Sequence, residues 1–444
     1  MLVPIALVTK NIILLTIDAL RADHVSWLGY ERDTTPFLDE FSERCTVFES
    51  AYSASSHTRE AVPALLTGRY PSEAVGDGFT RGAETIPMLL PDEYVTAAFH
   101  SNPYVSRAYG YDEGFDTFYD DLHLGQNKLL ALVQRALNKF VLNRGEYHAR
   151  AEGINQRALS WVSSRPDTEP FFLWNHYMDV HGPYNPPDGY AQWSENFSNN
   201  KAQDIYDRLT GEGPVSESDV QLALNLYDGE VRYVDEQIGA FLEILEERNL
   251  LDKSLVIITS DHGDLFGEYG LYAHPRHVYP ELTSIPLMIS HPEMESDYVE
   301  TAVSTLDIRS TIIDFNESSP VSGIGKSLLH YNSLDSNRAT YSSVLGENEE
   351  SNRRRFAIQT KDNAYWIERN IKTNKITKEG KIDFDSNQAL TTISNPNSLN
   401  GTLTTLREKL MEHSKIRLMN ENQTKTSLAH DKEVEERLEA LGYK

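Results

Sequence analysis

The sequence predicts an α/β fold in which a mainly parallel sheet is covered by helices on both faces. Short, continuous apolar runs recur through the first part of the chain, and segments with helical spacing of apolar residues lie between them. Strands and helices alternate in this way when the strands are parallel and buried on both faces.

Each predicted strand is an apolar run of the kind found in a parallel sheet that is buried on both faces. The predicted strands are Ile12 to Ile17, Tyr94 to His100, Phe171 to His176, Ser254 to Thr259 and Ile285 to Ile289. Each predicted helix is bounded by polar, glycine or proline residues. The predicted helices are Pro36 to Cys45, Ala61 to Leu66, Gly153 to Ser163, Val220 to Glu247 and Asp307 to Phe315.

The composition changes near Leu329, where Asn, Ser, Thr and Lys become frequent. Strand-like pieces follow at Phe356 to Thr360 and Tyr365 to Glu368, and a charged helix is predicted at Asp431 to Leu441. We therefore predict a catalytic domain over residues 1–328 and a small α+β subdomain over residues 329–444.

The acidic charge of the chain bears on its partners and on its source. A formal net charge of -26 makes nucleic acid and anionic membranes unfavourable partners. It is also typical of proteins from concentrated salt, so a halophilic, haloarchaeal type of protein is a hypothesis.

Cys45 is the single cysteine, and the start from Met1 to Val8 lacks the basic region of a signal peptide. We expect a cytoplasmic protein without a membrane span, and its oligomeric state is left open.

Two acidic positions directly follow predicted strands. Asp18 comes after the run that ends at Ile17, and Asp261 with His262 follows SLVIITS. Ligands of α/β sheets bind at such carboxyl ends, although a helix N-cap is an equally good interpretation of Asp18 alone. Two carboxylates on neighbouring strand ends would repel each other unless a cation lay between them. The pattern therefore predicts a metal site with oxygen and nitrogen ligands.

A hydroxyl-rich loop runs into a short helix in SASSHTREAVPALLTGRYP. Thr58 lies at the predicted helix start, where free N–H groups and the helix dipole favour an anionic oxygen and a bound phosphate or sulfate. Taken alone, Thr58 is better explained as an ordinary N-cap.

Together, these segments resemble the sulfatase family of the alkaline-phosphatase superfamily. The similarity spans the first three quarters of the chain, in the family's order. The segments that carry it are IDALRADHVSWLGY, TPFLDEFSERCTVFESAYS, NPYVSRAYGYDEGFDTFYDD, PFFLWNHYMDVHGPYNPP, SDHGDLFGEYGLYAH, IPLMISHP, STLDIRSTIIDF and GKSL.

The resemblance implies an alkaline-phosphatase-like fold and roles for particular residues. Asp18, Asp261 and His262 would bind one divalent metal ion, to which the nucleophile would bridge. His181 and His274 would contact the ester or protonate its leaving group, whereas without the resemblance each is a polar surface residue or a satisfied buried imidazole. An imidazole beside carboxylates favours zinc or manganese, with calcium as the alternative.

The nucleophile motif departs from the family's pattern of cysteine or serine, any residue, Pro, Ser and Arg ahead of Leu-Leu-Thr-Gly. Counting back from Leu65 puts Thr58 at the nucleophile position, and the proline and arginine are missing. Arg59 is a candidate replacement for the arginine, although the next helical position points elsewhere. Asn102 is a further candidate substrate contact.

We therefore expect a metal-dependent hydrolase or transferase of sulfate, phosphate or phosphonate esters, acting through a covalent Thr58 intermediate. A threonine cannot become formylglycine, which favours phosphoryl or phosphonyl transfer and phosphodiesterase activity. Related phosphoethanolamine and phosphoglycerol transferases also use threonine. A formylglycine-independent sulfatase and a metal-binding pseudoenzyme that recognises sulfated or phosphorylated glycans are the alternatives. The substrate is expected to be a small-molecule or glycan ester.

Overall fold

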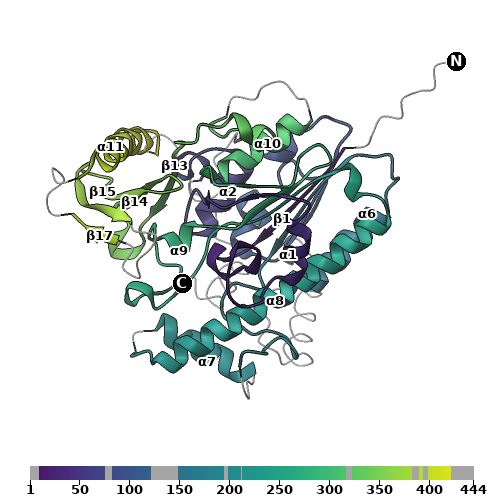
Figure 1. Ribbon diagram of the computed structural model, residues 1–444, viewed down its shortest axis with the longest axis horizontal. Coiled ribbons are helices and arrows are strands. Elements are labelled where there is room, and N and C mark those ends of the chain that lie inside the picture. The colour runs from purple at the N-terminus through teal and green to yellow at the C-terminus, as the bar shows by residue number, and fades with distance from the viewer. Residues whose placement is uncertain are drawn as a thin grey trace.

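The computed structural model describes residues 10–75, 83–121, 149–194, 199–211, 213–316, 323–382, 390–393 and 399–421. In these ranges the chain forms a large, mostly parallel sheet with helices on both faces and a smaller antiparallel sheet near the C-terminal end (Figure 1). The fold class predicted from the sequence is confirmed.

The strands of the large sheet are β1 (Asn11–Ile17), β2 (Thr46–Phe48), β4 (Val95–His100), β5 (Thr117–Tyr119), β6 (Phe171–Tyr177), β7 (Ser254–Ser260), β10 (Leu287–Ser290) and β11 (Asp297–Val299). Among the described residues their order is β11-β2-β10-β7-β1-β6-β4-β5. The central strands β7, β1, β6 and β4 are parallel, with Leu14 of β1 opposite Ile257 of β7 and Trp174 of β6. Their carboxyl ends therefore meet at one edge.

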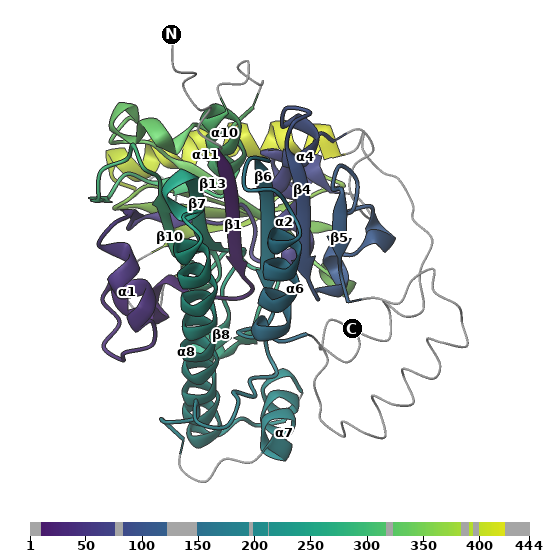
Figure 2. The same cartoon turned by 90° about the vertical axis from the view of Figure 1, so that its right-hand side faces the viewer.

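Helices cover both faces because both faces of β1 are apolar. Ile13 and Leu15 pack into the core under α1 (Pro36–Ser42), α6 (Ala151–Ser163) and α8 (Glu217–Glu247). Ile12 and Leu14 pack against α2 (Thr58–Thr67) and α10 (Leu306–Phe315). Figure 2 shows α6 and α8 in front of the parallel strands. Burial of both faces explains why the strands are continuous apolar runs.

The other elements of this part include helices of 4 to 12 residues and strands of 2 residues. The helices are α3 (Pro71–Ala74), α4 (Ile86–Leu89), α7 (Asn199–Thr210) and α9 (Pro280–Thr283), and the strands are β3 (Ala51–Tyr52), β8 (Leu265–Phe266), β9 (Tyr272–Ala273) and β12 (Val303–Ser304).

The prediction of a parallel strand at Ile285 to Ile289 is wrong in its direction. The structure has β10 at Leu287–Ser290, and β10 is antiparallel to β7 and to β2. The connection from β7 contains the hairpin of β8 with β9 and the four-residue helix α9, but no crossover helix. Because the chain re-enters the sheet from the edge at which β7 ends, β10 runs back against it.

The C-terminal part forms a separate antiparallel sheet with one helix packed on it. Its elements are β13 (Thr340–Leu345), β14 (Arg353–Gln359), β15 (Ala364–Asn370), β16 (Ile376–Ile382), β17 (Leu390–Thr392) and α11 (Gly401–Glu421). Phe356 and Tyr365 of the sheet pack with Leu406 and Leu410 of α11. This confirms a small C-terminal α+β subdomain, while the division between residues 328 and 329 stays a prediction.

Parts of the sequence interpretation lie outside the described residues. These are the start at Met1 to Val8 and the charged helix predicted at Asp431 to Leu441. In the ranges that the structure describes, no helix combines the length and the apolar character needed to cross a membrane.

Candidate active site

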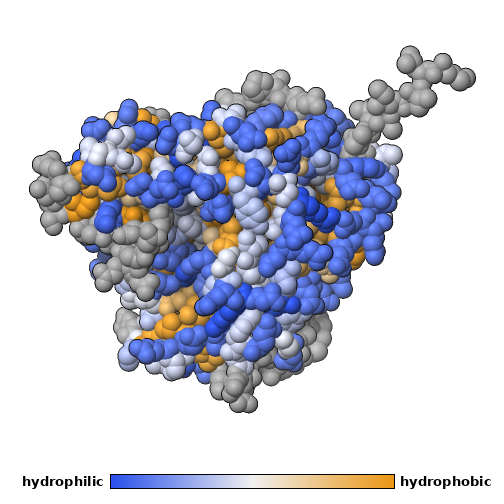
Figure 3. Space-filling model, viewed as in Figure 1, coloured by the Kyte–Doolittle hydropathy of each residue, from blue (hydrophilic) through white to orange (hydrophobic). Residues whose placement is uncertain are grey.

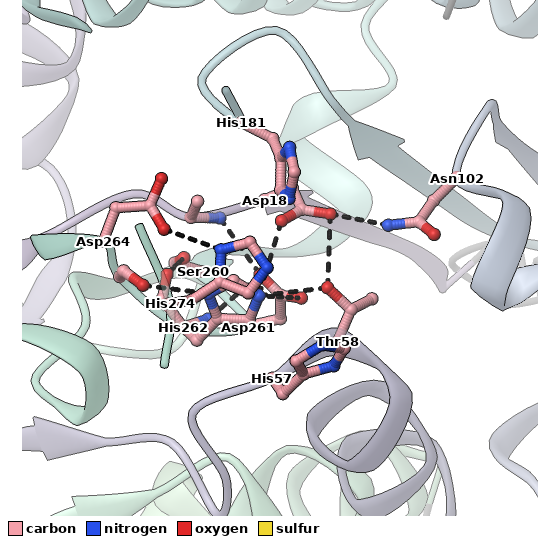
Figure 4. Close-up of polar contacts among 12 residues, drawn as sticks. Asp18, His57, Thr58, Asn102, His181, Ser260, Asp261, His262, Asp264 and His274 are labelled. Carbon is pink, nitrogen blue, oxygen red and sulfur yellow. Dashed lines mark hydrogen bonds and ion pairs between the residues drawn. The ribbon is translucent and has the colours of Figure 1, made fainter. Parts of the chain in front are cut away.

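The candidate site lies where the parallel strands end. Asp18 directly follows β1, Asp261 directly follows β7, and Asn102 lies two residues beyond β4. All three side chains are fully buried. Figure 4 shows them grouped with Thr58 and several histidines. The structure therefore brings together the strand-end residues that the sequence singled out.

Thr58 is the first residue of α2, and it is not the cap of that helix. The N-cap is His57, whose Nδ1 accepts a hydrogen bond from the backbone N–H of Arg59 at 3.3 Å. The Thr58 hydroxyl is buried and lies 3.0 Å from His262 Nε2 and 3.5 Å from Asp18 Oδ2. The hydroxyl thus faces the predicted metal ligands from the positive end of a ten-residue helix.

The tautomer of His262 follows from its contacts. Its Nδ1 lies 3.0 Å from the carbonyl oxygen of Gly263, which can only accept, so Nδ1 carries the proton. In the neutral ring, the lone pair of Nε2 therefore faces Asp18 Oδ1 at 3.6 Å and Asp261 Oδ2 at 3.7 Å. Gly263 is needed here, because a Cβ would collide with the carbonyl oxygen of Glu281.

Two carboxylate oxygens of this site accept no hydrogen bond from the described residues. They are Asp18 Oδ1 and Asp261 Oδ2, both fully buried. By contrast, Asp261 Oδ1 accepts the backbone N–H groups of Ala19 and His262 at 3.3 and 2.9 Å. Buried carboxylate oxygens without donors are costly unless a cation binds them. With the His262 lone pair they form a donor set that fits a divalent metal ion.

The two carboxylates influence each other's ionisation. Burial would raise the pKa of Asp18, but the hydrogen bond from His176 and the charges of His181 and His262 outweigh it and hold that pKa below its ordinary value. Burial and the charge of Asp18 raise the pKa of Asp261. A bound cation would favour the ionised form of both.

His176, at the end of β6, is a member of the site that sequence reasoning missed. Asp18, His176 and Asp261 each offer a ligand atom, and these atoms lie within 4.8 Å of one another. The described residues therefore contain a candidate metal site. The signal was present in the sequence, because His176 ends an apolar run as Asp18 and Asp261 do.

His181 and His274 are close neighbours. Their ring centroids are 4.9 Å apart, and that of His274 is 5.2 Å from His57 and 5.0 Å from His262. The Nδ1 of His274 donates to Asp264 Oδ1 at 2.9 Å. Burial lowers the pKa of His274, and Asp264 opposes this.

Asp264 was also missed from the sequence, although it lies in the quoted SDHGD segment. Its second oxygen accepts the hydroxyl of Tyr184 at 2.6 Å, so the carboxylate is held between Tyr184 and His274. This arrangement fixes the His274 ring, because Nδ1 is engaged and Nε2 is directed away from Asp264.

The two predicted substrate contacts differ in position. Asn102 donates from Nδ2 to Asp18 Oδ2 at 2.7 Å, so it holds a carboxylate of the site. Arg59 follows Thr58 on α2. Burial is the largest cause that lowers the pKa of His57, and the nearby positive charges of Arg276, His274 and His262 come next. The charge of Arg59 lowers that pKa further.

A cavity of about 440 Å³ opens beside His57 and His274. Besides His57, residues from three other parts of the chain line it. They are Tyr206, Leu209, Thr210, Gly211, Gly213 and Val215 in or after α7, Gly270 to Arg276 around β9, and Glu347 from the C-terminal part. The site therefore opens into a space in which a molecule larger than an inorganic anion fits.

The comparison with protein families decides the ancestry of this site. The family model described as sulfatase matches residues 10–316, which include every site residue named above except Glu347. The chain belongs to the sulfatase family. It is an ester hydrolase of that family.

The individual proteins that this chain is similar to share little sequence identity with it. The chain is 23% identical to the arylsulfatase of Clostridium perfringens over 422 residues, covering 80% of this chain and 85% of that protein. Its fold is similar to that of the phosphonate monoester hydrolase SpPMH from Silicibacter pomeroyi, with a TM-score of 0.71, 15% identity and coverage of 93% and 96%. It is also similar to BT4656, solved with its substrate D-glucosamine-2-N,6-O-disulfate, with a TM-score of 0.70, 19% identity and coverage of 93% and 98%.

Proposed function

We propose that this protein is a metal-dependent hydrolase of phosphate or phosphonate esters that works through a covalent Thr58 intermediate. The observation that carries the proposal is the position of the Thr58 hydroxyl, 3.0 Å from His262 Nε2 and beside the carboxylates of Asp18 and Asp261. Water would then hydrolyse the covalent intermediate and release phosphate or phosphonate from Thr58. If another alcohol attacked in place of water, the protein would act as a transferase.

Asp18 Oδ1, Asp261 Oδ2 and His262 Nε2 would hold the ion, together with Thr58 Oγ1. This agrees with the oxygens that accept no hydrogen bond among the described residues and with the His262 tautomer. Zinc or manganese suits this mixed oxygen and nitrogen set, with calcium as the alternative. When bound, such an ion lowers the pKa of the Thr58 hydroxyl and polarises an ester oxygen.

The residues of the chain supply the remaining chemistry. Thr58 attacks the phosphorus in line, and the N–H groups at the start of α2 stabilise negative charge on the transferred group. His274, held by Asp264, lies where it can protonate the leaving alcohol, with His181 beside it. An anionic substrate favours protonated His274 because its charge is opposite.

The nucleophile supports phosphorus over sulfur as the reacting atom. Residue 58 is a threonine, and Cys45 is buried in the core beneath α1 and forms no part of the site. The formylglycine route, in which a second hydroxyl expels sulfate, is therefore closed. A sulfated threonine would have to be attacked at sulfur.

The cavity beside His57 and His274 would take the alcohol portion of the ester. It offers Tyr206 and Tyr272 together with apolar Leu209, which suits a ring-shaped alcohol such as a sugar or an aryl group. A small-molecule or glycan ester is therefore the proposed substrate.

The test is a panel of 4-nitrophenyl phosphate, phosphodiester, phosphonate and sulfate with metal-loaded protein. We expect a phosphorus ester to be preferred, and Thr58→Ala to lower kcat by about a thousandfold or more. Thr67→Ala is the matched control, because Thr67 is also buried in α2, but its hydroxyl donates to the carbonyl of Pro63 and accepts the backbone N–H of Arg69. Full activity of Thr58→Ala would exclude the covalent mechanism, and preference for the sulfate would make the protein a formylglycine-independent sulfatase.

A further inference from the structure

His176 makes contacts through both ring nitrogens while fully buried at the end of β6. Its Nδ1 lies 2.8 Å from Thr16 Oγ1 on the neighbouring strand β1, and its Nε2 lies 3.2 Å from Asp18 Oδ2. Thr16 Oγ1 also accepts the indole N–H of Trp174 at 2.9 Å. Trp174, Thr16, His176 and Asp18 thus form a buried chain of hydrogen bonds.

The direction of this chain follows from the groups that can only donate or only accept. The indole of Trp174 can only donate, so it occupies an acceptor position of the Thr16 hydroxyl. A carboxylate oxygen can only accept, so the 3.2 Å contact between His176 and Asp18 Oδ2 is a hydrogen bond in which Nε2 carries the proton and donates it. The Thr16 hydroxyl lies 2.8 Å from His176 Nδ1 and 3.4 Å from the carbonyl oxygen of Asn175, so Nδ1 is the nearer acceptor for its proton.

Asp18 Oδ2 receives a second donor whose orientation is also fixed. Asn102 Oδ1 accepts the backbone N–H of Tyr104 at 2.9 Å, so the amide nitrogen of Asn102 is the atom that faces Asp18 at 2.7 Å. His176 and Asn102 thus both donate to Oδ2. The other oxygen of Asp18, Oδ1, is the one that accepts no hydrogen bond among the described residues and faces His262.

We infer that His176 is a positioning residue that orients Asp18 toward the metal ion, and that it is not itself a metal ligand. A ring with its proton on Nε2 has no lone pair there to offer an ion. The chain of hydrogen bonds from Trp174 through Thr16 engages Nδ1 of His176 and so keeps the proton on Nε2. His176 and Asn102 both hold Asp18 Oδ2, which turns Asp18 Oδ1 toward the ion. The inference rests on the proposed metal site.

The first readout is the number of imidazole ligands, measured by X-ray absorption on the manganese-loaded or zinc-loaded wild type. We expect one imidazole, from His262. Two imidazoles that fall to one in His176→Leu would overturn the inference, because His176 would then be a ligand.

The second readout is metal affinity, measured by competition with a chelating dye. We expect His176→Leu to bind manganese or zinc about 10- to 100-fold more weakly than wild type, as is typical when a group that supports a ligand is lost. His176→Gln places an amide N–H near the former Nε2, so we expect it to bind within a few-fold of wild type. Equal affinity of His176→Leu and wild type would overturn the positioning role.

Substitutions of Thr16 test the same chain of hydrogen bonds with a smaller structural change, in case His176→Leu does not fold. Thr16→Val keeps the shape of the side chain but removes the hydroxyl, and we expect weaker metal binding, whereas Thr16→Ser is the matched control with near-normal binding. If Thr16→Val bound the metal as tightly as wild type, Thr16 would have no part in orienting Asp18. Asp261→Asn separates the two proposals, because unchanged metal binding in that variant would defeat the metal site itself.

Discussion

The contacts of His274 set both the orientation and the pKa of its ring. Its Nδ1 donates to Asp264, and Asp264 is also bound by the Tyr184 hydroxyl. Burial lowers the pKa of His274, while Asp264 stabilises its charged form. The ring is therefore fixed in orientation, which the proposed role of His274 as general acid requires.

This arrangement predicts a dependence on the leaving group. We expect His274→Gln to lower kcat/KM for a phenyl ester by about 100-fold or more, since protonation of a poor leaving group contributes that much. The 4-nitrophenyl ester should lose far less, because its leaving group departs as an anion. Measuring kcat/KM for both esters checks this, and an equal loss for the two would exclude His274 as the general acid.

Asp264→Asn should show the same pattern in weaker form. The amide retains the shape but no longer stabilises charged His274, so the loss should again be larger for the phenyl ester. A loss that is the same for both leaving groups would mean that Asp264 acts only in keeping the site folded.

At the scale of elements, α2 is anchored to the C-terminal sheet through Glu60. This buried side chain lies two residues after Thr58, and it accepts hydrogen bonds from Ser55 at 3.2 Å, the backbone N–H of Leu345 at 3.1 Å and Arg354 at 3.1 Å. Both Glu60 and Arg354 are nearly inaccessible to water. The C-terminal sheet therefore holds the helix that carries the proposed nucleophile.

Breaking this contact should cost both stability and activity. We expect Arg354→Met to lower the free energy of unfolding by about 3 to 5 kcal/mol, because it leaves a buried carboxylate without its cation. It should also lower kcat more than it changes KM, since Thr58 would no longer be held in line. Denaturant unfolding and steady-state kinetics measure the two effects.

The matched control for this prediction is the exposed ion pair between Arg44 and Glu246 on α8. Arg44→Met should change the free energy of unfolding by at most about 1 kcal/mol, because solvent screens that pair. Similar losses in the Arg354 and Arg44 variants would contradict an anchoring role for Glu60.

Sequence periodicity predicted most elements near the site, but their ends needed the structure. The helix predicted at Ala61 to Leu66 begins at Thr58, three residues earlier. Polar residues in its first turn conceal that turn from an apolar pattern, since Thr58 and Glu60 are buried by tertiary contacts and not by hydrophobicity.

On the scale of the whole molecule, the dominant feature is the net charge of -26. Figure 3 shows the face in view covered largely by hydrophilic residues. Like charges on such a surface repel one another, and added salt screens that repulsion over a Debye length of about 10 Å at 0.1 M. The folded state should therefore gain stability as salt is added.

We expect the melting temperature to rise with potassium chloride, as measured by thermal unfolding with the metal content held constant. If screening alone acts, the rise should level off well below about 1 M salt, where the Debye length is near 3 Å. A rise that continues into molar salt would support the halophilic hypothesis. A melting temperature that does not change with salt would contradict both explanations.

The sequence by itself determined the family, the α/β fold and the strand-end positions of Asp18, Asp261 and His262, because these follow from local periodicity and from motifs whose order along the chain can be read directly. It did not determine the direction of β10, the contact of His176 with Asp18 or the anchoring of α2 by Arg354. Only the tertiary structure decided these, because each depends on which oxygen, nitrogen or strand edge meets a partner far away in the chain. The separation from Glu60 to Arg354 is 294 residues. Hydrogen-bond direction at a buried site is likewise set by neighbours in space, which periodicity along the chain does not encode.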